Sequence, residues 1–222
     1  SALRQTLARA RYHISFMCRP AIDGSFASGW HLHQSVAGSG GTNLFTPAED
    51  GAMTDTASGW IAGLLHHAPS MSLFAVPTIT GYKRYRAHSL APKRISWSHD
   101  GRGALIRALC RHGDAASRVE NRGGEPAANP YLYLASQMFA GLEGITARRE
   151  APPATADAYD DALPRLPSSL NEALALARDD AFVRDRFGAT FVDCYAAIKQ
   201  AEIAGFAAHV SDWEHRAYFA AF

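Results

Sequence analysis

Two histidines separated by one residue are the first side chains in this sequence that suggest chemistry. The stretch SGWHLHQSV, residues 28–36, contains His31 and His33. In an extended chain residues i and i+2 point to the same side, so both imidazoles would share one face of a strand. Two imidazoles do not complete a metal site, because zinc takes about three or four protein ligands and magnesium prefers carboxylate oxygens. The pair alone fits equally well with histidines that only hydrogen-bond to their neighbours.

A carboxylate between two arginines supplies possible partners for that pair. In RVENR, residues 118–122, Arg118, Glu120 and Arg122 alternate with apolar and amide side chains, so a strand would present all three on one face. Neighbouring guanidinium groups favour the ionised carboxylate. The pattern therefore predicts either a buried salt-bridge ladder or a metal-ligating carboxylate beside arginines that bind phosphate.

Further basic residues lie between positions 82 and 111. Arg84, Arg102 and Arg107 stand among glycine and apolar residues, which favours an inward-facing anion site, since guanidinium groups match phosphate and carboxylate oxygens. Three others are interpreted as a solvated basic surface: Lys93, Arg94 and Arg111.

The elements that must position these residues can be predicted from periodicity and punctuation. Strands are expected over 12–20, around the two histidines, and within 94–98, 104–110 and 116–122, with loops over 21–29 and 38–51. Helices are expected over 2–10, 54–68, from Asn129 onward, from Ser169 to near Gly188, and over 189–220 as one helix or a broken pair. In the Asn129 helix, apolar residues repeat at helical spacing: Leu132, Ala135, Met138, Phe139 and Leu142. Residues 150–170, rich in Pro and Ala, form a connector, and the order of strands before helices predicts an α+β fold.

Composition limits the classes of function. The chain has 222 residues, 22 Lys and Arg against 21 Asp and Glu, and no apolar run long enough for a membrane span, so neither a nucleic-acid nor a membrane partner is expected. Cys18, Cys110 and Cys194 are far apart and form no CxxC pair, which favours a reducing, cytoplasmic setting.

Several motifs together resemble the catalytic domain of the glutamine synthetase family. SGWHLHQS, PTITGYKRY, GRGALIR and RVENRGGEPAANPYLYLASQMFAGLEGI follow one another in the family's order and approximate spacing, from about residue 8 to the C-terminus. The last is the most specific, close to R-[IV]-E-x-R followed by P-A-A-N-P-Y. The resemblance implies a curved antiparallel sheet packed with helices, similar also to guanidino kinases. It further implies that residues 1–222 form a single catalytic domain without the family's N-terminal β-grasp domain and the first part of the catalytic domain.

The resemblance also implies roles for single residues. His31 and Glu120 resemble ligands of the Mg²⁺ or Mn²⁺ ion that bridges the phosphates of ATP, and Arg84 resembles the arginine that holds the α-carboxylate of the acid substrate. Arg122 resembles a second substrate-binding arginine, and Arg102 and Arg122 are the candidate catalytic side chains. The residues that resemble ATP-binding positions are His33, Ser35, Arg102, Arg107 and Arg118. Members of the family phosphorylate a carboxylate such as that of glutamate, and an amine or ammonia then attacks the acyl phosphate, so positioning and charge neutralisation carry the chemistry.

Departures from the family pattern narrow the expectation. Phe26 or Ala27 falls where an Asn-Gly pair usually precedes the first histidine, and Leu90 falls where the flap glutamate is expected. These changes favour a γ-glutamyl-amine synthetase over the ammonia-using enzyme, which remains an alternative, as does a silent nucleotide-binding or assembly relative. Because further metal carboxylates and a wall from a neighbouring subunit are implied, we expect a homo-oligomer and an inactive 222-residue chain on its own.

Overall fold

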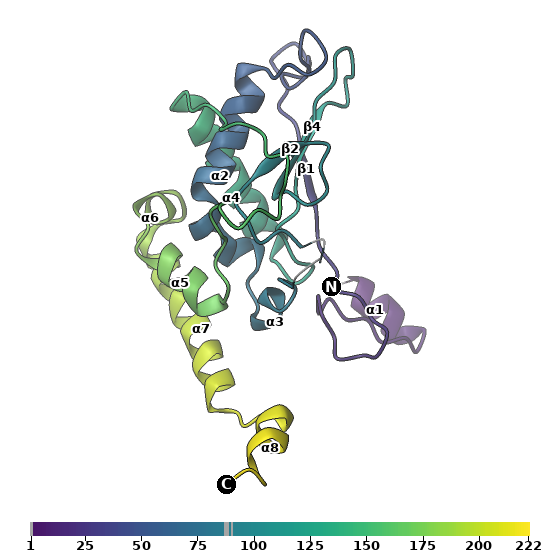
Figure 1. Ribbon diagram of the computed structural model, residues 1–222, viewed down its shortest axis with the longest axis vertical. Coiled ribbons are helices and arrows are strands. Elements are labelled where there is room, and N and C mark those ends of the chain that lie inside the picture. The colour runs from purple at the N-terminus through teal and green to yellow at the C-terminus, as the bar shows by residue number, and fades with distance from the viewer. Residues whose placement is uncertain (1, 87–88, 90) are drawn as a thin grey trace.

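The structure is a computed structural model that describes residues 2–86, 89 and 91–222 (Figure 1). The described helices are α1 (Ala2–Arg9), α2 (Asp55–Ala75), α3 (Ile79–Tyr82), α4 (Pro130–Thr146), α5 (Leu170–Arg178), α6 (Ala181–Phe187), α7 (Ala189–Ala208) and α8 (Asp212–Tyr218). The strands are β1 (Leu32–Gln34), β2 (Trp97–His99), β3 (Ile106–Leu109) and β4 (Arg118–Asn121). Helices and one small sheet in this order confirm the predicted α+β class.

The sheet has the strand order β1-β4-β3-β2, and its pairing differs from the expectation in one place. β4 lies antiparallel to both β1 and β3, as predicted, but β2 and β3 run parallel. The loop over residues 100–105 leaves the end of β2 and returns the chain to the level where β2 began. β3 therefore starts beside the start of β2, and the two strands run parallel. The sheet is therefore mixed rather than wholly antiparallel.

The helices α2 and α4 cover one face of the sheet (Figure 1). Small residues let their backbones touch: a Cβ placed on Gly63 would lie 2.0 Å from the carbonyl oxygen of Ala140, and one on Gly144 would lie 2.0 Å from that of Gly59. α2 begins at Thr54, whose side chain caps the helix, and passes through Pro69 to Ala75 instead of ending at 68. Burial of the segment after Pro69 stabilises this extension despite the missing N–H donor.

The most buried face of α4 is lined by small and polar residues more than by the apolar residues that repeat at helical spacing. Asn129 caps the helix and Pro130 occupies its first turn, as expected. The buried residues, however, are Tyr133, Ser136, Gln137, Ala140, Gly141 and Gly144, whereas Met138 and Leu142 of the apolar repeat are exposed. The small residues face α2, since only they allow the close backbone approach, and this packing overrides the apolar periodicity.

The N-terminal and C-terminal segments show further differences. Residues 12–20, expected as a strand, form no ladder with any residue that the structure describes. The helix expected from Ser169 to Gly188 is interrupted at Asp180, which caps α6. Gly188 ends α6 with a positive φ of 86°, and the region after it is the broken pair α7 and α8.

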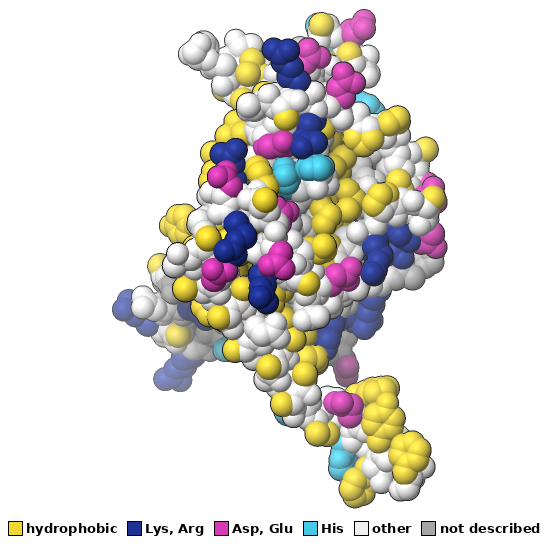
Figure 2. All heavy atoms as spheres, turned by 90° about the vertical axis from the view of Figure 1, so that its left-hand side faces the viewer, with side chains coloured by type: hydrophobic (Ala, Val, Ile, Leu, Met, Phe, Trp, Pro, Cys, Tyr) yellow, Lys and Arg dark blue, Asp and Glu magenta, His cyan; other side chains and the backbone are white. Residues whose placement is uncertain are grey.

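Charged side chains of both signs are interspersed over the face shown in Figure 2, and apolar side chains gather at the lower tip of that view. The exposed apolar residues of the C-terminal segment are Val210, Trp213, Tyr218, Phe219 and Phe222. Among the described residues, none of the helices combines the length and apolar character that crossing a membrane requires.

Candidate functional site

One row of register partners runs across the sheet and builds the site. Glu120 in the middle of β4 pairs with His33 on β1 and with Arg107 on β3. Register partners point to the same face, so the three side chains meet on one side of the sheet. His31, two residues before His33, points to the same side. The predicted shared face of the two histidines is therefore present, and it meets the carboxylate of Glu120.

Glu120 is the centre of the cluster, with a side chain only 4 % exposed. Its Oε1 lies 2.8 Å from Nδ1 of His31 and accepts a hydrogen bond from Nη1 of Arg122 at 3.1 Å. Its Oε2 accepts from Nη1 of Arg107 at 3.1 Å. Nε2 of His33 lies 4.0 Å from Oε1. Two arginines and two imidazoles thus surround one buried carboxylate.

The electrostatics of the cluster keep the carboxylate charged and His31 neutral. Burial raises the pKa of Glu120, but the hydrogen bond from Arg107 and the charge of Arg122 outweigh it, so the pKa lies below its usual range. Burial and the charge of Arg122 lower the pKa of His31, against the pull of Glu120. In a neutral His31, Nδ1 carries the proton that it donates to Oε1 of Glu120, and the other ring nitrogen keeps the lone pair that a metal ligand needs.

Arg118 is linked to the cluster through His33. Nε of Arg118 donates to Nδ1 of His33 at 3.1 Å, which assigns the proton of a neutral His33 to Nε2. Ser35 is exposed just beyond β1, and Arg102 is exposed in the loop between β2 and β3. Burial lowers the pKa of Arg122, and the charge of Arg102 contributes to the same shift.

Arg84 lies buried beside the cluster and is occupied by the backbone. Its guanidinium group donates to the carbonyl oxygens of Gly124 at 3.0 Å, Gly123 at 2.6 Å and Gly81 at 3.1 Å. Arg84 therefore holds the turn that follows β4 against the end of α3. In this arrangement it orders the backbone next to Arg122, and it lacks the free pair of donors that the predicted contact with a substrate carboxylate would use.

The residues present fit part of a divalent-metal site. An imidazole nitrogen and a carboxylate oxygen are donors that a divalent ion takes, and His31 and Glu120 lie in contact, with Nδ1 and Oε1 2.8 Å apart. Within the described residues, no group of three His, Cys, Asp or Glu side chains completes such a site. His31 and Glu120 can supply two ligands of a metal ion, and the other ligands must come from other residues or from the bound substrate.

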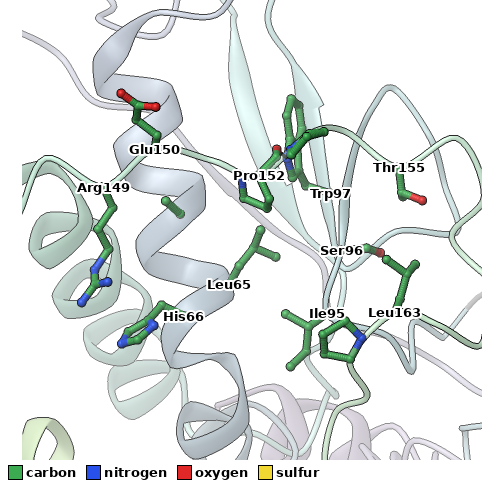
Figure 3. Close-up of a pocket in the computed structure, with 13 residues that line it drawn as sticks. Leu65, His66, Ile95, Ser96, Trp97, Arg149, Glu150, Pro152, Thr155 and Leu163 are labelled. Carbon is green, nitrogen blue, oxygen red and sulfur yellow. Dashed lines mark hydrogen bonds between the residues drawn. The ribbon is translucent and has the colours of Figure 1, made fainter.

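A separate hollow lies away from this cluster. A cavity of about 580 Å³ separates α2 from the connector after α4 and from the start of β2. Figure 3 shows Leu65 of α2 facing Ile95 and Trp97 across it, with His66 and Arg149 toward the other side of α2. None of the predicted site residues lines this cavity, so it does not mark the cluster around Glu120.

The sequence did not predict one member of the cluster, and one predicted position lies outside the residues that the structure describes. Asp100 accepts a hydrogen bond from Arg107 and was not predicted; the only signal is the Asp-Gly pair directly after a predicted strand. Leu90, the predicted flap position, lies outside the described residues.

An α+β domain that gathers a carboxylate, two imidazoles and several guanidinium groups on one sheet face has the composition of a site for a metal-bound polyphosphate. Residues 1–218 match the family described as "Glutamine synthetase, catalytic domain", and the chain belongs to that family.

Three relatives place the chain within the family. It is 41% identical to a gamma-glutamylanilide synthase of Acinetobacter sp, over 99% of this chain and 47% of that protein. It is 36% identical to a glutamine synthetase of Neisseria gonorrhoeae, over 85% of this chain and 42% of that protein. A solved structure titled "Apo GmaS without ligand" superposes with a TM-score of 0.86 and 26% identity, over 98% of this chain and 51% of that one. The chain thus spans about half the length of the relatives that it matches.

Proposed function

We propose that the protein is an ATP-dependent ligase that joins the γ-carboxylate of glutamate to an amine through a γ-glutamyl phosphate. The cluster around Glu120 carries this proposal, because phosphoryl transfer between two anions requires preorganised positive charge and a metal ligand. The family membership and the 41% identity to a gamma-glutamylanilide synthase support it.

Each side chain then has a defined task. His31 and Glu120 hold Mg²⁺ or Mn²⁺, which would neutralise charge on the ATP phosphates when bound. Arg107 and Arg118, on neighbouring strands, and Arg102, in its loop, would bind the phosphates of ATP, and His33 and Ser35 would bind the nucleotide. Arg122, only 5 % exposed, steadies the γ-carboxylate as it is phosphorylated. Arg84 shapes the substrate side through the backbone that it holds.

The preferred nucleophile is an organic amine. Leu90 replaces the acidic flap residue, and leucine can neither attract ammonium nor accept its proton. An alkyl or aryl amine gains instead from contact between its carbon body and an apolar flap. The alternative, a glutamine synthetase that uses ammonia, is supported by the 36% identity to such an enzyme.

Cellular setting and assembly form the remaining part of the proposal. All three cysteines are free, which fits a reducing cytoplasm. The incomplete metal site at His31 and Glu120 fits a homo-oligomer whose full-length chains supply the other ligands and walls. Light scattering on the full-length protein tests the assembly.

The test is ATP turnover by the full-length protein with glutamate and a panel of ammonium, ethanolamine, isopropylamine and aniline, with the amide product identified by mass spectrometry. We expect ADP release that depends on both glutamate and an organic amine. Glutamine as the main product would establish the ammonia-using alternative. Binding of Mg²⁺-ATP without turnover of any tested amine would favour a silent relative. A matched variant, Glu120→Gln, should abolish turnover if the activity belongs to this site.

A further inference from the structure

Asp100, the residue that follows β2, has an unusual backbone conformation. Its φ is +54°, in the left-handed region that Asp, Asn and Gly tolerate better than other residues. Such a conformation persists only where surrounding contacts hold it, and it concentrates near functional sites. Its backbone N–H donates to the carbonyl oxygen of Ala108 at 3.0 Å, which ties this strained residue to β3.

In this conformation Asp100 accepts two hydrogen bonds from one guanidinium group. Its carbonyl oxygen accepts a hydrogen bond from Nε of Arg107 at 3.1 Å, and its carboxylate accepts another from Nη2 of the same residue. The remaining nitrogen of Arg107, Nη1, donates to Oε2 of Glu120. All three nitrogens of Arg107 are thereby held in place: Nε and Nη2 by Asp100, and Nη1 by Glu120.

A second cation keeps the carboxylate of Asp100 in place. Nη2 of Arg111 lies 3.3 Å from Oδ2, while Arg107 binds Oδ1. The hydrogen bond from Arg107 lowers the pKa of Asp100, so the group is ionised at neutral pH. Asp100 nevertheless remains half-exposed, at 48 %, which separates it from the buried core of the cluster.

We propose that Asp100 is a positioning residue for nucleotide binding, which acts by holding Arg107 in the orientation that faces both Glu120 and an incoming phosphate. This inference rests on the proposed function. Charge alone predicts the opposite effect, because an extra carboxylate near a polyphosphate repels it. Removing the carboxylate therefore separates the two explanations: lost positioning weakens nucleotide binding, whereas relief of repulsion strengthens it.

The test is the dissociation constant of a non-hydrolysable ATP analogue with Mg²⁺, measured by calorimetry on the full-length protein. Asp100→Asn tolerates the left-handed backbone and keeps the carbonyl contact, but it removes the charge and replaces one of the two acceptor oxygens by an NH2 group. We expect the dissociation constant to rise about tenfold, the low end of the effect of groups that orient ligands in metal sites. The KM for ATP should rise while the KM for glutamate stays constant. Asp100→Gly, which keeps the backbone conformation without a carboxylate, should give the same loss.

Two controls make the result specific. Asp161→Asn removes an exposed aspartate that pairs with Arg94 outside the cluster, and it should leave nucleotide binding unchanged. In an Arg107→Ala background, Asp100→Asn should cause no further loss, since a positioning residue acts only through its partner.

Unchanged or tighter nucleotide binding by Asp100→Asn would overturn the inference, as would fully additive losses in the double variant. If the unaltered protein binds no Mg²⁺-ATP, the proposed function falls together with it. If the unaltered protein binds Mg²⁺-ATP and Asp100→Asn binds it equally well, only the role of Asp100 is refuted.

Discussion

Nδ1 of His31 lies 2.8 Å from Oε1 of Glu120, although 88 residues separate them along the chain. The contact crosses from the residue before β1 to the middle of β4, and the antiparallel register of the two strands produces it. Since Glu120 also binds Arg107 and Arg122, any change at Glu120 affects both the candidate metal site and a buried charge network.

Glu120→Gln should lower both stability and metal affinity. Removing one partner of a buried ion pair costs about 3–5 kcal/mol, and we expect the lower part of this range because glutamine keeps one acceptor oxygen. Denaturant unfolding measures the stability, and titration with Mn²⁺ measures the metal affinity. Glu202→Gln, which breaks a surface pair with Lys199, should cost no more than about 1 kcal/mol. Equal stabilities of the two variants would contradict this reading of the cluster.

Gly63→Ala should disrupt the packing of α2 on α4. The added methyl group would lie 2.0 Å from the carbonyl oxygen of Ala140, which is backbone and cannot move aside cheaply. We expect a loss of about 3 kcal/mol or more, at or above the usual cost of overpacking. Gly205→Ala in α7 meets nothing within 4 Å and should stabilise the protein by about 0.5–1 kcal/mol through helix propensity. Thermal unfolding should therefore move in opposite directions for the two variants.

His67 should make stability depend on pH between neutral and mildly acid conditions. Burial lowers the pKa of His67 below 6.5, although Glu143, 3.1 Å away, opposes the shift. As pH falls below 6.5 the unfolded chain binds more protons than the folded one, so the free energy of unfolding decreases.

His67→Gln removes this titration while keeping a hydrogen-bond donor for Glu143. The free energy of unfolding, measured by denaturant at each pH, should differ less between the unaltered protein and the variant as pH falls from 7.5 toward 5.5. Hydrogen bonding from Arg149 lowers the pKa of Glu143 below 4.5. The contribution of Glu143 to stability is therefore lost only below pH 4.5, outside this window. A constant difference between His67→Gln and the unaltered protein would refute the assignment.

Leu90→Glu should shift the amine preference of the full-length enzyme toward ammonium. A carboxylate at this position attracts a small cation and accepts its proton, while it places charge against the carbon body of a larger amine. The ratio of kcat/KM for ammonium to that for the best organic amine measures the shift. Leu90→Gln adds polarity without charge and should leave the ratio nearly constant. If the unaltered enzyme already uses ammonium as efficiently as any organic amine, the inference from Leu90 is wrong.

The sequence by itself determined the parts of this protein that depend on neighbouring residues. The cap at Asn129, the turn at Pro130 and the break at Gly188 follow from backbone geometry and local hydrogen bonds, and each was predicted correctly. The alternation in 118–122 and the spacing of His31 and His33 placed the chemical side chains on strand faces for the same reason. The family motifs then indicated which distant segments belong together.

The tertiary structure decided the features in which long-range packing outweighs local preference. α4 turns its small residues toward α2 because close backbone contact excludes larger side chains, and α2 continues through Pro69 because the residues beyond it are buried. No local pattern predicts that β2 and β3 pair in parallel or that Arg84 is buried among backbone carbonyls. The two hydrogen bonds that Asp100 accepts from Arg107 likewise join residues seven positions apart, and Asp100 accepts them with a left-handed backbone at the edge of the sheet.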